Sequence, residues 1–294
     1  MSRRGLTLVE LVVVLLILVA VASVALRSTE GLVQQGRFDA TQRTVRNLED
    51  AIIGPDSLRS PSGEVLVTGF VSDVGRLPNA IGTDPATQLS ELWRPEAIPA
   101  YALRQATEDS EVELGTGWRG PYLRLAPGSS RLLDGWGRAL NLLQADRVTL
   151  VTAGQPVEAI FSYGQNNTRD LTPPGTYDND LGVDLRVTAT PASNRVDSSV
   201  GGTVTLDPAN GDTVIVVLYV PSAGVVTAIN SGPISVSTSS TTFSSLACTI
   251  GARAIRAYQG NGLTMATLGS ATNRSEVKRI VVLPGGHSET LDIP

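Results

Sequence analysis

Residues 1–30, MSRRGLTLVELVVVLLILVAVASVALRSTE, decide the fold class expected for this chain. A short basic leader, residues 1–5, precedes an apolar run over residues 6–26. That run is long enough to cross a bilayer as a helix, which takes about 20 residues. A carboxylate inside such a helix costs roughly 2.5–3.5 kcal/mol on insertion scales, so Glu10 is predicted to have a functional partner.

The stretch GLTLVE at residues 5–10 resembles the processing site of type IV pilins and of the pseudopilins of type II protein secretion systems. In that family a prepilin peptidase cuts after the glycine and methylates the new N-terminus. The resemblance implies prepilin cleavage between Gly5 and Leu6, N-methylation of Leu6, and a role in assembly for Glu10, the fifth mature residue. The family usually has Phe where this chain has Leu6. Glu10 of one subunit would neutralise the new amine of its neighbour in the low-dielectric fibre core.

Two other interpretations fit part of the same stretch. A secretory signal peptide has a basic start and an apolar region, and residues 20–22, Ala-Val-Ala, match its small-x-small cleavage site. A plain single-pass anchor would also be apolar. Both leave Glu10 unexplained, because an acid in the apolar region opposes insertion.

Composition excludes several classes of function. The chain has 294 residues, enough for about two domains, and its net charge of −5 predicts no nucleic-acid partner. One cysteine, Cys248, excludes an intrachain disulfide, and with one histidine, His287, the chain lacks the ligands of a His/Cys zinc site. No catalytic constellation is evident, so the chain is not expected to be an enzyme.

Helical periodicity continues beyond the apolar run. Apolar and small residues recur at spacings of three and four, at Phe38, Thr41, Val45, Leu48 and Ile52, before Gly-Pro at residues 54–55 ends the pattern. We therefore expect one helix over residues 6–53, embedded in a membrane at 6–26 and covered by a head domain further on. The basic leader predicts a single-pass inner-membrane protein with a cytoplasmic N-terminus and a periplasmic head.

Residues 54–184 are predicted to form that head. The turn Asp-Gly-Trp-Gly at residues 134–137 resembles the Asp-Pro-Trp-Gly turn of the major pseudopilins, with Gly135 in place of the proline. It is expected to place Trp136 against the head core. Three short strands between residues 140 and 163 then predict a small antiparallel sheet.

A loop after these strands carries the candidate metal ligands. Asp178 and Asp180 match the closing Asp-x-Asp of the calcium site in the major pseudopilins, and Asn167 and Asp170 are further candidates. Calcium takes six to eight oxygen ligands, which carboxylates, amides and loop carbonyls supply. The alternative is an acidic turn without an ion. No other cofactor is expected.

Beyond residue 184 the chain becomes rich in Val, Thr, Ser and Gly, with turn residues between seven candidate strands. Residues 185–294 are therefore predicted to form an appended all-β sandwich, whose segment 250–258 resembles a late strand of immunoglobulin-like modules. The complete expectation is an α+β chain: a long transmembrane and amphipathic helix on a small antiparallel sheet (the pilin fold), followed by the sandwich.

These expectations lead to a functional hypothesis. The resemblance implies a structural subunit of a type II secretion pseudopilus or type IV pilus, which polymerises with itself or with other pilin-like subunits. Its further partners would be the prepilin peptidase and the membrane platform of the assembly machine, and the fibre would be periplasmic or extracellular. One alternative is a pilin-anchored adhesin or substrate-binding protein that acts through residues 185–294. Another is a secreted β-domain enzyme released by ordinary signal cleavage.

Overall fold

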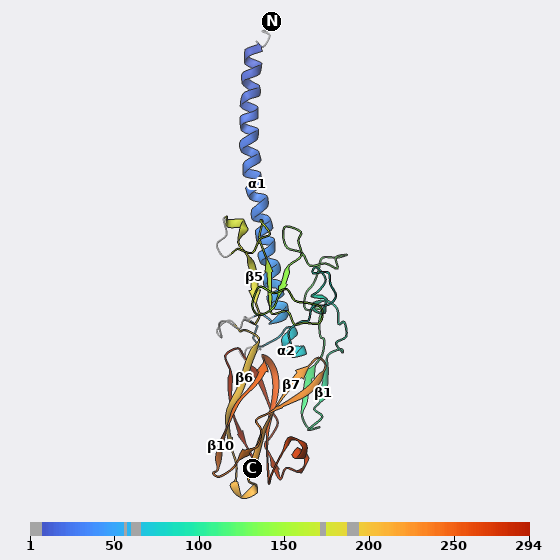
Figure 1. Cartoon of the computed structure of the whole chain (residues 1–294), viewed down its shortest axis with the longest axis vertical. Helices are drawn as coiled ribbons and strands as arrows, with labels where there is room; N and C mark the ends of the chain where they lie inside the picture. The colour runs from blue at the N-terminus through green and yellow to red at the C-terminus, as the bar shows by residue number, and fades with distance from the viewer. Residues whose placement is uncertain (1–7, 56–57, 60–65, 171–174, 187–193) are drawn as a thin grey trace.

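The computed structural model describes residues 8–55, 58–59, 66–170, 175–186 and 194–294. The molecule is a rod (Figure 1). One long helix, α1 (Leu8–Ile52), begins near one end of the rod, and a β-rich body surrounds and extends beyond its other end. The start of α1 and the C-terminus therefore lie far apart.

Short elements follow α1 in the head. They are α2 (Phe70–Val74), η1 (Ser90–Leu92), β1 (Ala102–Gln105), β2 (Glu113–Thr116), β3 (Asn141–Leu143), β4 (Ala159–Ser162), η2 (Thr176–Asp178) and β5 (Leu181–Asp184). Antiparallel pairing gives the sheet β3-β4-β5 and the separate hairpin β1-β2.

The remaining strands make up the C-terminal part. They are β6 (Asp197–Thr205), β7 (Thr213–Ser222), β8 (Val225–Asn230), β9 (Ile234–Ser235), β10 (Ser240–Thr249), β11 (Gly251–Gly260), β12 (Asn273–Arg274), β13 (Lys278–Val282) and β14 (His287–Asp292), with the short helices η4 (Pro208–Asn210) and η5 (Met265–Ser270). One sheet has the order β10-β6-β14, with β14 parallel to β6. The second has the order β12-β11-β7-β8, with β13 beside β11 and β9 beside β7. We call β6–β14 the C-terminal sandwich, and valines, leucines and isoleucines of both sheets form its core.

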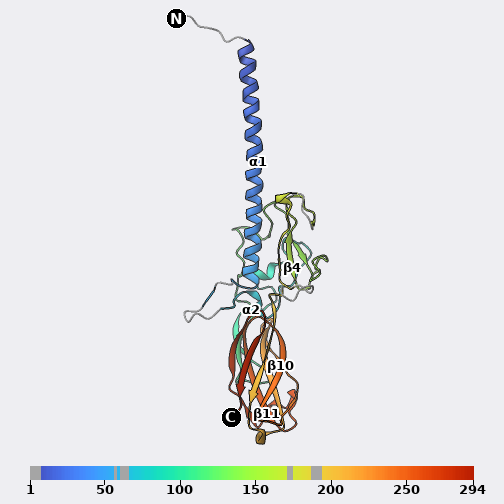
Figure 2. The same ribbon diagram turned by 90° about the vertical axis from the view of Figure 1, so that its left-hand side faces the viewer.

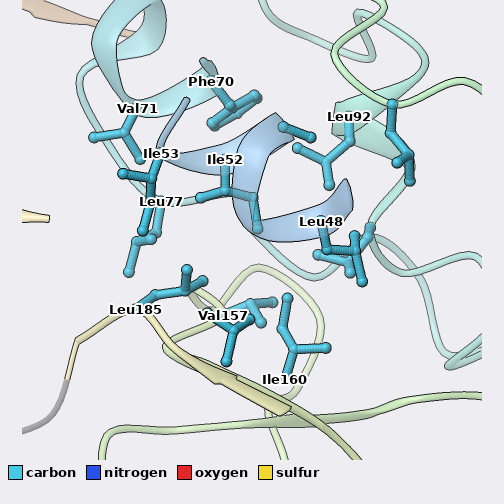
Figure 3. Packing of buried hydrophobic residues seen from close by; sticks show 14 of the residues in the cluster. Leu48, Ile52, Ile53, Phe70, Val71, Leu77, Leu92, Val157, Ile160 and Leu185 are labelled. Atoms are coloured by element: carbon cyan, nitrogen blue, oxygen red, sulfur yellow. The ribbon is translucent and has the colours of Figure 1, made fainter. Parts of the chain in front are cut away.

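The last turns of α1 are buried because their apolar seam faces the head. Leu48 and Ile52 are fully buried and pack with Phe70 of α2, Ile160 of β4 and Leu185 after β5 (Figure 3). A seam at spacings of three and four places these side chains on one face of the helix. The sheet β3-β4-β5 meets α1 mainly through β4 and β5.

Gly135, in the Asp-Gly-Trp-Gly turn at residues 134–137, allows that turn to contact α1 directly. A Cβ at Gly135 would lie 1.9 Å from the backbone oxygen of Arg37, and the Gly135 N–H donates to Thr41 Oγ1 at 2.8 Å. Trp136 does not point into the head core: it is half-buried, and its indole N–H donates to Gln34 Oε1 of α1 at 3.2 Å. The turn is therefore packed against α1 and hydrogen-bonded to it.

The β1-β2 hairpin covers the outer face of the β12-β11-β7-β8 sheet. Ala106, Val112 and Leu114 are buried against Ile215, Tyr219 and other residues of that face. The hairpin thus adds a third layer to the C-terminal sandwich, although it comes from a segment far earlier in the chain.

The short helix α2 joins the end of α1 to the C-terminal sandwich. All five of its residues are buried, and it contacts both β7 and β11. The Ala223 N–H donates to the Val74 oxygen at 2.8 Å, and Thr249 Oγ1 donates to the Gly75 oxygen at 3.1 Å. The fully buried guanidinium of Arg253 donates to backbone oxygens of Thr249, Ile250 and Ala252 beside this joint. These bonds fix the sandwich to the head.

The expected α+β class, built on a transmembrane helix packed against a sheet, is wrong. Strands predominate over helices, and within the described ranges no helix is long and apolar enough to cross a membrane. The same finding overturns the predicted membrane-embedded segment over residues 6–26. It also overturns the predicted single-pass inner-membrane location, with a cytoplasmic N-terminus and a periplasmic head.

Candidate functional site

The first half of α1 exposes apolar side chains all around the helix. The exposed fraction is 80% at Leu8, 67% at Leu16 and 61% at Val21. We call residues 8–23 the exposed apolar segment; its large members are Leu8, Val9, Leu11, Val12, Val13, Val14, Leu15, Leu16, Ile17, Leu18, Val19 and Val21. An apolar surface of this kind marks a site of interaction.

The predicted processing and assembly residues lie at the start of this helix. Gly5 and Leu6 fall outside the described residues. Glu10 lies on the first turn of α1 and is exposed, where its charge is favourable to the helix dipole. The structure thus places Glu10 within the exposed apolar segment.

The candidate metal ligands lie in a loop that packs beside α1. We call residues 163–170 and 175–180 the acidic loop. The Gln165 N–H donates to the Tyr177 oxygen at 2.8 Å, which holds its two halves together. Tyr177 in turn packs edge-on against Phe38 of α1, with 6.1 Å between ring centroids, and its hydroxyl donates to Gln35 at 3.3 Å. The loop is therefore fixed relative to the helix.

Two of the four candidate ligands come together. The Asp170 N–H donates to Asp180 Oδ2 at 3.2 Å, whereas Asp180 Oδ1 is buried and has no hydrogen-bond partner among the described residues. Burial, and then the charge of Asp170, raise the pKa of Asp180 above its usual range, although the Asp170 N–H and Arg169 oppose them. A cation at Oδ1 would supply the missing partner and relieve the repulsion between the two carboxylates.

The other two candidates point elsewhere. Asp178 turns back over Gly175, where a Cβ would lie 2.9 Å from Asp178 Oδ2. Asn167 has a left-handed backbone, with φ of 57°, and lines a crevice with Arg138 and Leu140. Within the described ranges no group of three or more His, Cys, Asp or Glu side chains is placed to hold a metal ion. Calcium at Asp180 would therefore need backbone carbonyls or water for most of its ligands.

Replacing Asp180 by asparagine tests the site. A carboxyl with a raised pKa is protonated more readily in the folded state, so its contribution to stability falls as pH rises through its titration range. Without a divalent cation, Asp180→Asn is expected to raise the melting temperature at pH 7. With calcium at 100 times its dissociation constant, the wild type should gain about 2.7 kcal/mol and the variant should gain none.

Thermal melts with and without calcium measure both effects, and Asp50→Asn, an exposed position on α1, is the control. The control should keep the full calcium response. An equal response in the wild type and Asp180→Asn would contradict a site at Asp180.

No family model, no curated protein and no solved structure matches this chain. The exposed apolar segment and the acidic loop are therefore the features of this chain that bear on its function.

Sequence reasoning missed one buried polar cluster. Asp109, in the loop between β1 and β2, accepts hydrogen bonds from Arg256 Nη1 at 2.8 Å and from the Tyr258 hydroxyl at 2.5 Å, and Tyr258 bonds in turn to Tyr219. Arg256 and Tyr258 are two positions apart and so lie on the same face of β11, but nothing in the sequence pairs that face with residue 109.

Proposed function

We propose that this chain is a structural subunit of a pilus-type fibre, of the type II secretion pseudopilus or type IV pilus kind, and that it assembles through α1. The observation that carries this proposal is the exposed apolar segment. Removing apolar surface from water yields about 25 cal/mol per Å². A run of large aliphatic side chains that are each at least half exposed therefore gives a strong drive towards association.

The distribution of these side chains favours a fibre core over a simple dimer. A helix that packs against one partner carries one apolar stripe, whereas a helix that is apolar all round is buried on all sides. Leu15, Leu16, Ile17 and Leu18 point in successive directions about 100° apart, and each is more than half exposed. Several neighbouring helices are needed to cover them together.

The N-terminal residues would set the register between neighbouring subunits of the fibre. Cleavage between Gly5 and Leu6 by a prepilin peptidase would create a positive amine at Leu6, four residues before Glu10 in the sequence. Within a packed core of helices the effective dielectric is low, so an amine and a carboxylate from adjacent subunits attract strongly and must be paired. We infer that Glu10 accepts the amine of a neighbouring subunit. The acidic loop, fixed against α1, lies near enough to the helix to contribute lateral contacts.

Replacing Leu16 by glutamate is expected to abolish incorporation into fibres. The change places a charge in the middle of the exposed apolar segment, where the packed core would leave it without a partner. Incorporation is measured as the amount of this chain in fibres sheared from the producing cells and collected by centrifugation. The melting temperature of the head should not change, because Leu16 makes no contact with it.

Leu103→Glu is the matched control, since Leu103 on β1 is 66% exposed and Leu16 is 67% exposed. This control should assemble normally. N-terminal sequencing of the fibre-borne chain should give a methylated terminus at Leu6. Normal assembly of Leu16→Glu, or a mature terminus near residue 23, would contradict the proposal.

A further inference from the structure

The C-terminal sandwich has two open sides, and only one of them is protected by charge. On one side the outer strands are β13 and β14, which carry Lys278, Arg279, Glu289 and Asp292. On the other side the outer strands are β8 and β10, VVTAIN and STTFSSLACT, which contain no charged residue and no proline. Exposed strand edges of native proteins are commonly protected from pairing by charges or by proline. The side formed by β8 and β10 is therefore open to an added strand.

The free edge of β8 is the more regular of these two edges. A bulge breaks the register of β10, whereas β8 pairs with β7 without a break. The Ser231 N–H donates to the Val216 oxygen at 3.0 Å, just beyond the end of β8. Because bonded and non-bonded pairs alternate along an antiparallel ladder, the N–H and C=O groups of Val226 and Ala228 point away from β7. In the part of the chain that the structure describes, no further strand pairs with them.

A notch of about 520 Å³ lies between the start of β8 and the β1-β2 hairpin. Its lining includes two residues of β8 and four of the hairpin: Val225, Val226, Leu103, Arg104, Gln105 and Glu113. Leu103 is 66% exposed and Val225 is 56% exposed, so the rim of the notch is apolar on both sides. Val226 is buried and packs against the hairpin, so the notch opens along the face of β8 that the hairpin covers.

Arg104 brings a positive charge to this notch. It lies opposite Leu114 in the hairpin, and Leu114 is buried against the sheet, so Arg104 is on the hairpin face that is turned towards the sheet. The Nε of Arg104 is buried and has no hydrogen-bond partner among the described residues. Glu113, the acid of the lining, instead accepts a hydrogen bond from Gln105 Nε2 at 3.5 Å. A buried donor without a partner is unfavourable, and a guanidinium matches the geometry of a carboxylate, so an external carboxylate would complete this arrangement.

We propose that the free edge of β8 binds an extended segment of another protein, which pairs with β8 as an added strand and places a carboxylate on Arg104. Residues of that segment opposite Val226 and Ala228 form the backbone hydrogen bonds. Their side chains point to the same face as Val226 and Ala228, which is the face towards the hairpin and the notch. The acidic residue therefore lies opposite Val226. A second copy of β8 or β10 brings no carboxylate and would leave Arg104 unpaired.

This site is remote from the surface through which the chain is proposed to assemble. Figure 1 and Figure 2 both show the C-terminal sandwich at the opposite end of the rod from the exposed apolar segment. The two surfaces do not overlap, so binding at β8 does not depend on the proposed fibre function. A chain that binds the segment but does not enter fibres would contradict the fibre function alone.

Fluorescence anisotropy with the full chain, held in a non-ionic detergent, tests the inference. The probe is the labelled peptide acetyl-Thr-Val-Thr-Glu-Thr-Val-Thr-amide, and the comparison peptide has Gln in place of Glu. Because a hydrogen bond to a charged group is the stronger kind, the Glu peptide is expected to bind about 10- to 100-fold more tightly. Methylating the backbone nitrogen of its Glu should abolish binding, since that N–H pairs with β8. Equal binding of the Glu and Gln peptides, or no loss on N-methylation, would overturn the inference.

Four variants of the full chain locate the site. Arg104→Gln should remove the preference for the Glu peptide, whereas Arg124→Gln, at an exposed position of the head, should keep it. Ala228→Pro should abolish binding of both peptides, because it removes an outward N–H at a strand edge, where proline is tolerated. Val281→Pro, on the outer strand β13, is its matched control and should bind normally. Should Ala228→Pro fail to fold, as its melting curve would show, the N-methylated peptide makes the same test.

Two results with these variants would overturn the inference. One is a preference for the Glu peptide that persists in Arg104→Gln. The other is self-association of the wild type that Ala228→Pro abolishes, measured by analytical ultracentrifugation, because it would assign the edge of β8 to a second copy of this chain.

Discussion

Replacing Asp109 by alanine is expected to lower the free energy of unfolding by about 3–5 kcal/mol, because it removes the acidic partner of a buried ion pair. Asp109 is 6% exposed and Arg256 is 8% exposed, and Asp109 Oδ2 lies 2.8 Å from Arg256 Nη1. The same oxygen accepts a hydrogen bond from the buried Tyr258 hydroxyl at 2.5 Å. Alanine would leave both donors without this acceptor, and the β1-β2 hairpin would keep only the exposed Glu111 contact to Arg256 of β11. Urea denaturation measures the loss.

The pH dependence of that loss has a defined sign. Burial alone would raise the pKa of Asp109, but hydrogen bonds from Tyr258 and the Glu111 N–H, together with the charge of Arg256, outweigh it and lower the pKa below its usual range. A carboxyl whose folded pKa is lowered stabilises the protein above its unfolded pKa, and this contribution is lost as pH falls through the folded pKa. The difference between the wild type and Asp109→Ala should therefore shrink below about pH 4.

Glu111→Gln is the control for this prediction. Glu111 also contacts Arg256 Nη1, but its side chain is 61% exposed. An exposed ion pair contributes about 1 kcal/mol or less, so this change should cost little. Equal losses from the two variants would mean that the hairpin is held by surface charge, and not by the buried cluster.

Replacing Gly75 by alanine is expected to destabilise the protein by about 2–5 kcal/mol and to loosen the sandwich from the head. Gly75 has φ of 84°, which costs a residue with a Cβ about 1–2 kcal/mol. Its Cβ would also lie 1.7 Å from the backbone oxygen of Pro221, and forcing extra atoms into a packed site costs about 1–3 kcal/mol more. Denaturation, and the rate of proteolysis within the joint, measure the effect.

Gly82→Ala separates the two contributions. Gly82 has φ of 70°, but a Cβ there would have no atom within 4 Å. It should therefore show only the conformational cost of about 1–2 kcal/mol. A loss at Gly75 no larger than that at Gly82 would show that the joint yields easily.

Local features of the fold could be predicted from the sequence where they depend on nearby residues. The spacing of Val45, Leu48 and Ile52 places them on one buried face of α1, because helix periodicity is a local property. The Asp-Gly-Trp-Gly turn was predicted as a turn, but not as a clamp on the helix. Its contact with Arg37 depends on a backbone approach between segments about a hundred residues apart.

The candidate site, too, could be predicted from the sequence only in part. A carboxylate-rich loop after β4 was evident from residue types, yet only Asp170 and Asp180 meet, because backbone direction and not composition decides where a side chain points. The transmembrane interpretation was wrong, because no helix of the described residues meets the length and hydropathy that a span requires. The apolar side chains that led to it are the exposed apolar segment, from which the proposed function is argued.

The sequence by itself determined the helix seam, the strand-rich C-terminal half and the acidic loop, since each depends on a short-range pattern of side chains. Only the tertiary structure decided that the β1-β2 hairpin covers the C-terminal sandwich, that α2 joins the sandwich to α1, and that the two lie in line. Those arrangements come from contacts such as Asp109–Arg256 and Gly75–Pro221, which join residues more than a hundred positions apart. Such contacts form because the two surfaces fit together and are buried in the folded chain. The sequence around either residue does not indicate which residue it will contact.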